Sequence, residues 1–332
     1  MTMTEDVVQQ VPACPICNTS NNLEVTPYID AHHPPSRIFD GLSIVFCTVC
    51  GFGCSSPEIE EKAVNEFYEH TYRGIDSPHA IAFSELSKPV SYDCRSLAQL
   101  LLARHFVEVE SGDSFADIGP GGGRSFASAS TVLKTPKMYA VELSDGAAAA
   151  YKRIYGVDTF KSVKSLNEHI GRLKIILSSH SLEHFKFGQL ESLFADVKNA
   201  LSSDGVLVVE VPHNDMRIHL KTRNSDSPHF LFFSKESLRW GLESFGFDVL
   251  FLESCGASYE DWRHHETTKT ARQDSSLKGK GRTAYEKMPM SVKGVIRRAY
   301  MHFRRESLNF GDANFSYGGN RACLRAVVRP GK

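Results

Sequence analysis

The stretch Phe115-Ala-Asp-Ile-Gly-Pro-Gly-Gly-Gly-Arg-Ser-Phe126 decides the fold of this chain. Its short apolar run ends in an acid, Asp117, and then opens into glycines at positions 119, 121 and 123. Glycine adopts backbone angles that other residues avoid and leaves room for a ligand against the main chain. An acid at the end of a strand, followed by a glycine turn and a helix, is typical of an α/β sheet that binds a nucleoside.

The spacing of the glycines indicates which nucleoside this is. A dinucleotide fingerprint needs G-x-G-x-x-G, and counting from Gly119 puts Arg124 at the third glycine. The pattern that is present, D-x-G-x-G-x-G, resembles the first motif of the class I S-adenosylmethionine (SAM) dependent methyltransferases. The alternative is a glycine-rich loop of no special meaning, so the neighbouring elements must decide.

Strands and helices alternate after the glycine turn, which predicts a parallel sheet with crossover helices. A second strand ends in Glu142, 19 positions beyond Gly123, where an acid can accept hydrogen bonds from both ribose hydroxyls. The predicted strands are 114–118, 138–142, 157–160, 173–178, 205–211, 247–253 and an antiparallel 321–329. Helices are predicted at 58–72, 91–107 and 147–155, with a fourth that ends at 244.

Two cysteine pairs near the N-terminus predict a metal site. Cys14-Pro-Ile-Cys17 and Cys47-Thr-Val-Cys50 are separated by 29 residues, and two C-x-x-C knuckles without a secretory signal indicate four-cysteine zinc binding. Four protein ligands leave no open coordination position, so the zinc should be structural. His32 and His33, between the knuckles, are alternative ligands.

Charge is distributed unevenly along the chain. From Trp262 onward there are 16 Lys+Arg and 5 Asp+Glu (net +11), and the remainder has 22 and 34 (net −12), which together give −1. This basic segment suggests an anionic partner or substrate. Within it, residues 290–308 form an amphipathic basic stripe that would contact a membrane surface at most peripherally, or would pack on its own domain.

The N-terminal residues lack the basic and apolar regions of a signal peptide, and no apolar run is long enough to span a bilayer. The expected location is the cytoplasm. The expected segments are a zinc ribbon (1–56), linking helices (57–110), the SAM-binding domain (111–256), a basic insertion (257–319) and the final strand (320–332).

The motifs occur in the order and spacing of class I methyltransferases: Asp117 to Gly123, Glu142, His180-Ser-Leu-Glu-His184, and Asp204 to Pro212. The resemblance covers roughly residues 90–255 and the final strand. It implies a Rossmann-like seven-stranded α/β sheet with the last strand antiparallel. It also implies a SAM site formed by Asp117, Gly119, Gly121, Gly123, Glu142 and Ser179.

The chain looks like the branch with an N-terminal four-cysteine zinc ribbon, which includes deoxysugar C-methyltransferases and other saccharide or natural-product methyltransferases. The long gap between the knuckles and the segment His229-Phe-Leu-Phe-Phe-Ser234 favour this branch over ribosomal RNA methyltransferases. The deoxysugar enzymes carry Tyr-x-Glu-His here, whereas this chain has Asp226 and Pro228 in place of the tyrosine and glutamate. Their large C-terminal domain also has no counterpart. Methylation of a saccharide hydroxyl is therefore expected rather than C-methylation.

A hydroxyl acceptor needs a base that takes its proton as it attacks the SAM methyl group. Histidine suits this role because its pKa lies near working pH. The candidates are His229 first and His180 second, then Glu183 and His184; each could instead be a hydrogen-bonded structural residue.

The expected partner is a small-molecule or glycan acceptor, either neutral or anionic. The rival interpretations are a sugar C-methyltransferase, an RNA or tRNA methyltransferase, and a non-catalytic module with a SAM fold. The near-zero net charge and the few aromatic residues between the knuckles argue against nucleic acid.

Overall fold

The computed structural model of this 332-residue chain describes residues 13–31, 37–72, 94–134, 136–170, 172–220, 222–260 and 313–331. The chain divides into two compact units, residues 1–253 with 324–332, and residues 254–323. The larger unit contains both the N-terminal cysteine pairs and the glycine turn.

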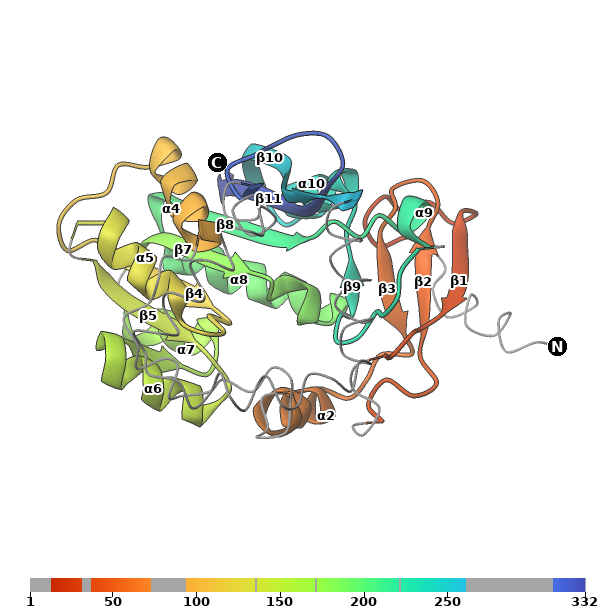
Figure 1. Ribbon diagram of the computed structural model, residues 1–332, viewed down its shortest axis with the longest axis horizontal. Helices are drawn as coiled ribbons and strands as arrows, with labels where there is room; N and C mark the ends of the chain where they lie inside the picture. Colours follow the sequence, from red (N-terminus) through yellow and green to blue (C-terminus); the bar gives the residue numbers. More distant parts are fainter. Residues whose placement is uncertain are drawn as a thin grey trace, which may run out of the picture. The chain divides into compact units, whose positions relative to one another are not determined.

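A seven-stranded sheet has the order β10-β11-β8-β7-β4-β5-β6, with β11 antiparallel to the others (Figure 1). Its strands are β4 (Ser114–Ile118), β5 (Lys137–Val141), β6 (Asp158–Phe160), β7 (Leu173–Ser179), β8 (Leu201–Pro212), β10 (Phe247–Ser258) and β11 (Arg321–Pro330). The chain leaves the first strand, β4, toward β5 on one side and later returns to β7 on the other. The carboxyl ends of β5, β4 and β7 therefore meet at the centre of the sheet, where open α/β sheets bind ligands.

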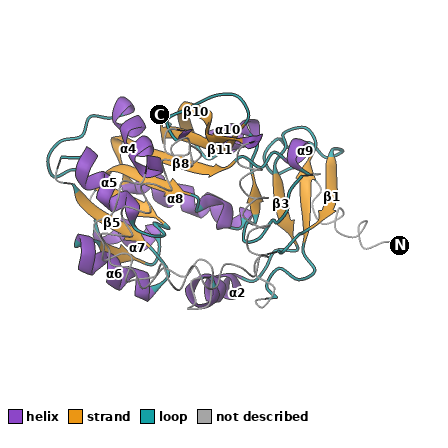
Figure 2. Ribbon diagram, in the orientation of Figure 1, coloured by secondary structure: helices purple, strands orange, loops and turns teal. Residues whose placement is uncertain are grey.

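Helices cover both faces of this sheet, as the colouring in Figure 2 shows. One apolar cluster joins one face to α4 (Cys94–Phe106), α5 (Arg124–Val132) and α6 (Asp145–Tyr155). A second joins the other face to α7 (Val163–His169), α8 (Leu190–Ala200) and α10 (Lys235–Ser244). Along β4 the two faces alternate: Phe115 lies in the first cluster, and Ala116 and Ile118 lie in the second. The predicted Rossmann-like class is confirmed.

The cysteine pairs belong to a separate four-stranded sheet with the order β1-β2-β3-β9. Strands β1 (Leu23–Pro27), β2 (Ser43–Cys47) and β3 (Gly53–Ser56) come from the N-terminal region. The fourth, β9 (Leu231–Phe232), comes from the segment after β8 and pairs with β3 through Gly53↔Phe232 and Cys54↔Leu231 (Figure 1). The apolar run Phe230–Phe233 thus completes the ribbon sheet, a pairing that the sequence did not predict.

Most predicted elements recur with small shifts at their ends. Strand β4 has the predicted bounds, whereas β8 begins four residues earlier than predicted, at Leu201. The predicted helix 58–72 is α2 (Glu61–Glu66), which continues as the π-helix η2 (Phe67–Thr71). Strand β10 runs to Ser258, five residues beyond the predicted end of this strand at 253.

Several expectations lie outside the described residues. These are His32 and His33, the start of the predicted helix 91–107, and the basic stripe 290–308 with most of its insertion. The five-segment division of the chain stays a prediction. Within the described ranges, no helix is both long and apolar enough to cross a membrane.

Candidate functional site

The glycine turn after β4 leaves open space for a ligand. Gly119, Gly121 and Gly123 have φ of 68°, 57° and 67°, in the left-handed region that favours glycine. A Cβ at Gly123 would lie 3.0 Å from the Tyr151 ring, whereas one at Gly121 would meet no described atom within 4 Å. The turn therefore packs on its helix side and is open at its centre.

Acids and a serine end the strands around this turn. Asp117 on β4 is 2% exposed and accepts a hydrogen bond from the Ser125 hydroxyl at the start of α5. Glu142, directly after β5, is 7% exposed, and its Oε1 accepts from the Ser144 amide at 3.0 Å. Ser179 ends β7, the strand on the other side of β4. The structure thus brings all the predicted SAM residues to the carboxyl ends of three adjacent strands.

This arrangement fits SAM. The open space over Gly121 can admit a ligand against the main chain, and Glu142 stands one strand away as an acceptor for ribose hydroxyls. Ser179, at the end of β7, accepts a hydrogen bond from Nε2 of Gln99 on α4 at 2.7 Å.

His180, the residue after β7, lies between two buried glutamates. Its Nδ1 is 3.4 Å from Glu183 Oε1, and its Nε2 is 3.4 Å from Glu210 Oε1. Its φ is +52°, unusual for a residue with a side chain. One carboxylate therefore lies beside each nitrogen of the His180 ring.

Glu210, on β8, is the centre of a buried ionic network. It is 1% exposed and accepts from Arg325 Nε at 2.6 Å and from Gln99 Nε2 at 2.9 Å; Arg95 Nε lies 3.3 Å away. Burial alone would raise the pKa of this carboxyl, but Arg325, His180 and Arg95 hold it well below its usual range. These contacts link β8 to β11 and to α4 next to His180.

Glu183, His184 and His229 form the second polar group of the site. Glu183 and His184 lie in the short 3-10 helix η3 (Leu182–His184), and His229 lies just before β9. His229 Nε2 is 4.0 Å from Glu183 Oε1, and the rings of His184 and His229 are 5.2 Å apart. The backbone carbonyl of Pro228 accepts a hydrogen bond from the Tyr68 hydroxyl at 2.8 Å. The carbonyl of His229 accepts one from the Tyr28 hydroxyl, also at 2.8 Å.

Glu183 is a buried carboxylate that lacks a conventional hydrogen-bond donor. It is 1% exposed, and within the described part of the chain neither of its oxygens receives a hydrogen bond. Burial raises the pKa of this carboxyl, but the neighbouring imidazoles of His180, His184 and His229 outweigh burial and lower it to about 2. A buried carboxylate whose described neighbours are imidazole rings can still accept a hydrogen bond from a ligand.

This pKa predicts an acid-sensitive contribution to stability. The folded-state pKa of about 2 lies below the ordinary value of 4.5, so ionised Glu183 favours the folded state above pH 4.5, and the effect is lost as pH falls to about 2. We expect wild type to lose of the order of 2–3 kcal/mol more unfolding free energy than Glu183→Gln between about pH 5 and pH 2. Urea unfolding at several pH values measures this. Glu243→Gln, an exposed-site control, should follow wild type, and parallel curves for wild type and Glu183→Gln would refute the assignment.

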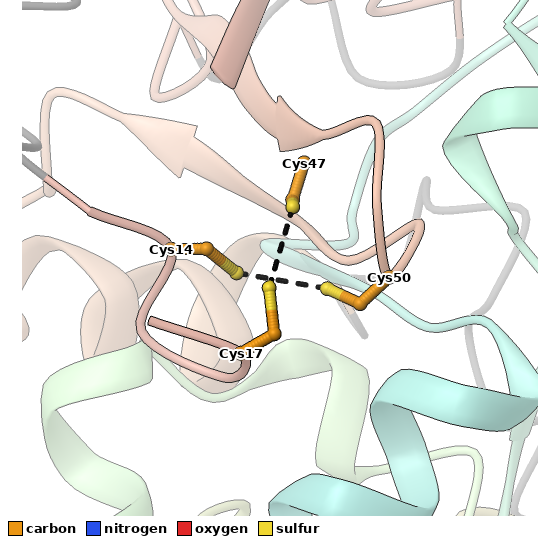
Figure 3. Close-up of side chains that lie close together, drawn as sticks. All are labelled: Cys14, Cys17, Cys47 and Cys50. Carbon is orange, nitrogen blue, oxygen red and sulfur yellow. Dashed lines mark hydrogen bonds between the residues drawn. The ribbon is translucent and has the colours of Figure 1, made fainter. Parts of the chain in front are cut away.

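The four predicted cysteine ligands converge (Figure 3). Cys14 Sγ is 3.6 Å from Cys50 Sγ, Cys17 Sγ is 3.5 Å from Cys47 Sγ, and all four sulfurs lie within 4.8 Å of one another. Sulfurs at 2.3 Å from a tetrahedral zinc ion are separated by about 3.8 Å. The four sulfurs therefore have the spacing of a four-cysteine zinc site.

The distances between donor atoms also distinguish the four cysteines from the second candidate group, which contains two histidines. Glu183, His184 and His229 also place ligand-type atoms within 4.8 Å of one another. Donors about 2.1 Å from one tetrahedral ion would be about 3.4 Å apart, whereas Glu183 Oε1 and His229 Nε2 are 4.0 Å apart. This separation is that of an ion pair.

The second knuckle is attached to the segment that follows β8. The main chain around it is bonded at three points: Val49 O accepts from Arg217, Cys50 O from Ser234, and Gly51 O from the Met216 amide. A Cβ at Gly51 would lie 2.4 Å from Asp215 Oδ1, so only glycine fits there. The cysteines are therefore connected through β3 and β9 to the segment that carries His229.

Sequence reasoning missed the tyrosines and Glu210. Tyr68 lies in the predicted helix 58–72, and nothing in the periodicity of a helix reveals that its hydroxyl reaches Pro228. Glu210 did leave a signal, because an acid within the apolar run of β8 must find buried partners.

The comparisons with known proteins agree with the fold. Residues 89–252 match the family described as "Methyltransferase domain". No curated protein matches the chain.

Several solved structures are similar to this chain. Phosphoethanolamine N-methyltransferase 2 of Haemonchus contortus, in complex with SAM, has 13% identity and a TM-score of 0.45 over 94% of this chain and 70% of that chain. Cyclopropane synthase MmaA2 of Mycobacterium tuberculosis has 17% identity and a TM-score of 0.42 over 70% and 82%. Coclaurine N-methyltransferase, bound to N-methylheliamine and S-adenosylhomocysteine, has 17% identity and a TM-score of 0.44 over 73% and 74%.

The glycine turn, the acids that flank it and the sheet order agree with this family match. The protein is therefore a SAM-dependent methyltransferase, and its residues 89–252 are the part that matches the methyltransferase family model.

Proposed function

We propose that this enzyme methylates a hydroxyl group of a saccharide, either free, nucleotide-linked or at a glycan end, and that His229 is the general base. The observation that carries the proposal is Glu183, a buried carboxylate to which no described residue donates a hydrogen bond, beside the partly exposed rings of His180 and His229. A polyhydroxylated acceptor has hydroxyls to offer to both groups, one to Glu183 and the reacting one to His229.

The residues of the glycine turn would hold the methyl donor. Asp117, Glu142 and Ser179 would bind its polar groups, and the main chain at Gly119–Gly123 would lie against it. SAM, when bound, supplies a methyl group on a positively charged sulfur. The protein must then orient the acceptor oxygen in line with that methyl group and remove its proton.

His229 suits proton removal better than His180. His180 has a carboxylate beside each ring nitrogen, so an acceptor hydroxyl would compete with Glu183 or Glu210 for either one. Among the described residues, the carboxylate that faces His229 is Glu183, whose Oε1 lies 4.0 Å from Nε2 and would favour protonation of the ring. Glu183 would then stabilise the charged ring that forms.

We also propose that Cys14, Cys17, Cys47 and Cys50 bind a structural zinc ion. The near-tetrahedral sulfur spacing supports this, and four thiolates would leave no coordination position for a substrate. The zinc would fold the ribbon and take no part in methyl transfer.

The test is incubation with isotope-labelled SAM and a panel of nucleotide sugars and glycan acceptors, followed by mass spectrometry. We expect a gain of one methyl group on a saccharide oxygen. A methyl group on a saccharide carbon would show that the enzyme is a C-methyltransferase and not an O-methyltransferase. Methylation of RNA, with binding that weakens steeply as salt rises, would overturn the saccharide assignment. Failure to bind SAM would favour a non-catalytic module.

The cofactor site gives a separate prediction. Glu142→Gln keeps the size of the side chain but removes the charge that would accept two ribose hydroxyls, so SAM affinity should fall about 10- to 100-fold. Calorimetric titration with SAM measures this. Asp158→Asn, on the neighbouring strand β6 and exposed, is the control and should bind normally. Unchanged affinity in Glu142→Gln would remove this residue from the SAM site.

A further inference from the structure

Two tyrosines from the N-terminal region hold consecutive carbonyls of the loop that carries His229. Tyr28 follows β1 of the ribbon, and its hydroxyl donates to His229 O at 2.8 Å. Tyr68 lies in the π-helix η2, and its hydroxyl donates to Pro228 O at 2.8 Å. The main chain of residues 228 and 229 is thereby held by side chains that are 160 or more positions away in the sequence.

Burial keeps both hydroxyls as donors. It is the main cause that raises the pKa of Tyr68 and of Tyr28 well above the usual value. The carboxylates of Asp226 and Asp30 add to this effect at Tyr28, and Arg223 opposes it. At Tyr68, Tyr72, Tyr28 and Glu183 act in the same direction as burial. Each tyrosine therefore has one hydroxyl proton to donate.

The Tyr68 hydroxyl also determines which ring nitrogen of His184 carries a proton. His184 Nδ1 lies 2.9 Å from Tyr68 Oη and 3.2 Å from Pro228 O. Because Tyr68 gives its single proton to Pro228 O, its oxygen can only accept from His184. Both neighbours of Nδ1 are then acceptors, so Nδ1 carries the proton, and Nε2 is the acceptor in the neutral ring.

We propose that Tyr68 and Tyr28 are positioning residues of the methyl-transfer site. They fix the backbone at Pro228 and His229, and with it the distance between the His229 ring and Glu183. In addition, Tyr68 fixes the Nδ1–H tautomer of His184, whose ring lies against that of His229. The link to catalysis rests on the proposed role of His229 as base, whereas the tautomer assignment stands without it.

Tyr68 and Tyr28 can each be replaced by phenylalanine, which gives two variants that differ in the hydrogen bonds they lose. Tyr68→Phe removes the bonds to Pro228 and His184, whereas Tyr28→Phe removes only the bond to His229 O and does not touch His184. Tyr139→Phe, on β5 away from the loop, is a control for loss of a tyrosine hydroxyl. All three keep the ring and its packing.

The test uses the full chain labelled with ¹⁵N-histidine, and two-bond ¹H–¹⁵N spectra report which ring nitrogen is protonated. Signals are assigned by their loss in His184→Gln and His229→Gln. We expect His184 as the Nδ1–H form in wild type, in Tyr28→Phe and in Tyr139→Phe, and a mixture of tautomers in Tyr68→Phe. His229 signals should shift in Tyr28→Phe and Tyr68→Phe but not in the control.

Turnover with a saccharide acceptor is the second measurement. We expect kcat to fall about 10- to 100-fold in Tyr68→Phe and Tyr28→Phe, with SAM affinity unchanged. The proposal is overturned if wild-type His184 is the Nε2–H form, or if Tyr68→Phe leaves both histidine signals unaltered. If the histidine signals respond as expected and no saccharide is methylated, the positioning holds and the acceptor assignment fails. The wild-type spectrum decides the tautomer even if a variant does not fold.

Discussion

Replacing Cys50 with serine is expected to release the zinc ion and to disorder the loop that carries His229. Cys50 is fully buried, and its carbonyl accepts the Ser234 hydroxyl that begins α10. A four-cysteine site supplies much of the folding free energy of a small ribbon, so loss of one ligand should reduce bound zinc from about one ion per chain to near zero. The consequence should extend to β9, since β3 pairs with it through Gly53 and Phe232.

Elemental analysis and thermal unfolding measure this, and Cys54→Ser is the control. Cys54 lies on β3 in the same sheet but outside the four-cysteine cluster, and burial raises the pKa of its thiol to about 12, so it remains protonated. We expect this variant to retain its zinc. The site is refuted if wild type contains no zinc, or if Cys50→Ser and Cys54→Ser retain equal amounts.

The parts of the fold that the sequence predicted are those governed by short-range signals. The run from Ser114 to Ile118 ends at a glycine turn that only a strand-to-helix connection explains, and β4 has those bounds. Glu142 could be placed because a parallel sheet puts successive strand ends at one edge, and β4 pairs with β5 in that register. The two knuckles fix their own spacing, so their convergence was also predictable.

The pairing of β9 with β3 could not be predicted in this way. The run Phe230–Phe233 is apolar on every residue, so its pattern does not distinguish a strand of the large sheet from one of the ribbon. The contact joins residues about 180 positions apart, and such long-range pairing has no local signal. It is nevertheless the contact that places His229 next to Tyr28 and Tyr68.

The polar partners of the site were hidden for a related reason. The sequence placed His180 at the end of β7, but it could not show that Glu183 and Glu210 would lie on either side of the ring. Those two contacts support the order of the candidate bases that the sequence predicted, with His229 before His180. Each ring nitrogen of His180 has a carboxylate beside it, and for this reason we propose His229 as the base.

Loss of the His229 imidazole should therefore have the largest effect on turnover. Removal of a general base costs typically 10²- to 10⁴-fold, so we expect kcat of His229→Gln to fall by about 100-fold or more. Glutamine keeps a polar side chain but cannot take up the acceptor proton, and His229 is not one of the predicted SAM-binding residues, so SAM affinity should be unchanged. Steady-state kinetics and calorimetry measure turnover and SAM affinity separately, and His105→Gln, exposed on α4, is the matched control.

His180→Gln should instead disturb the pairs of this ring with Glu183 and Glu210. It should lower stability as well as turnover, because it leaves two buried carboxylates without the imidazole that they share. Full activity in His229→Gln, with loss of turnover but no loss of stability in His180→Gln, would transfer the base to His180.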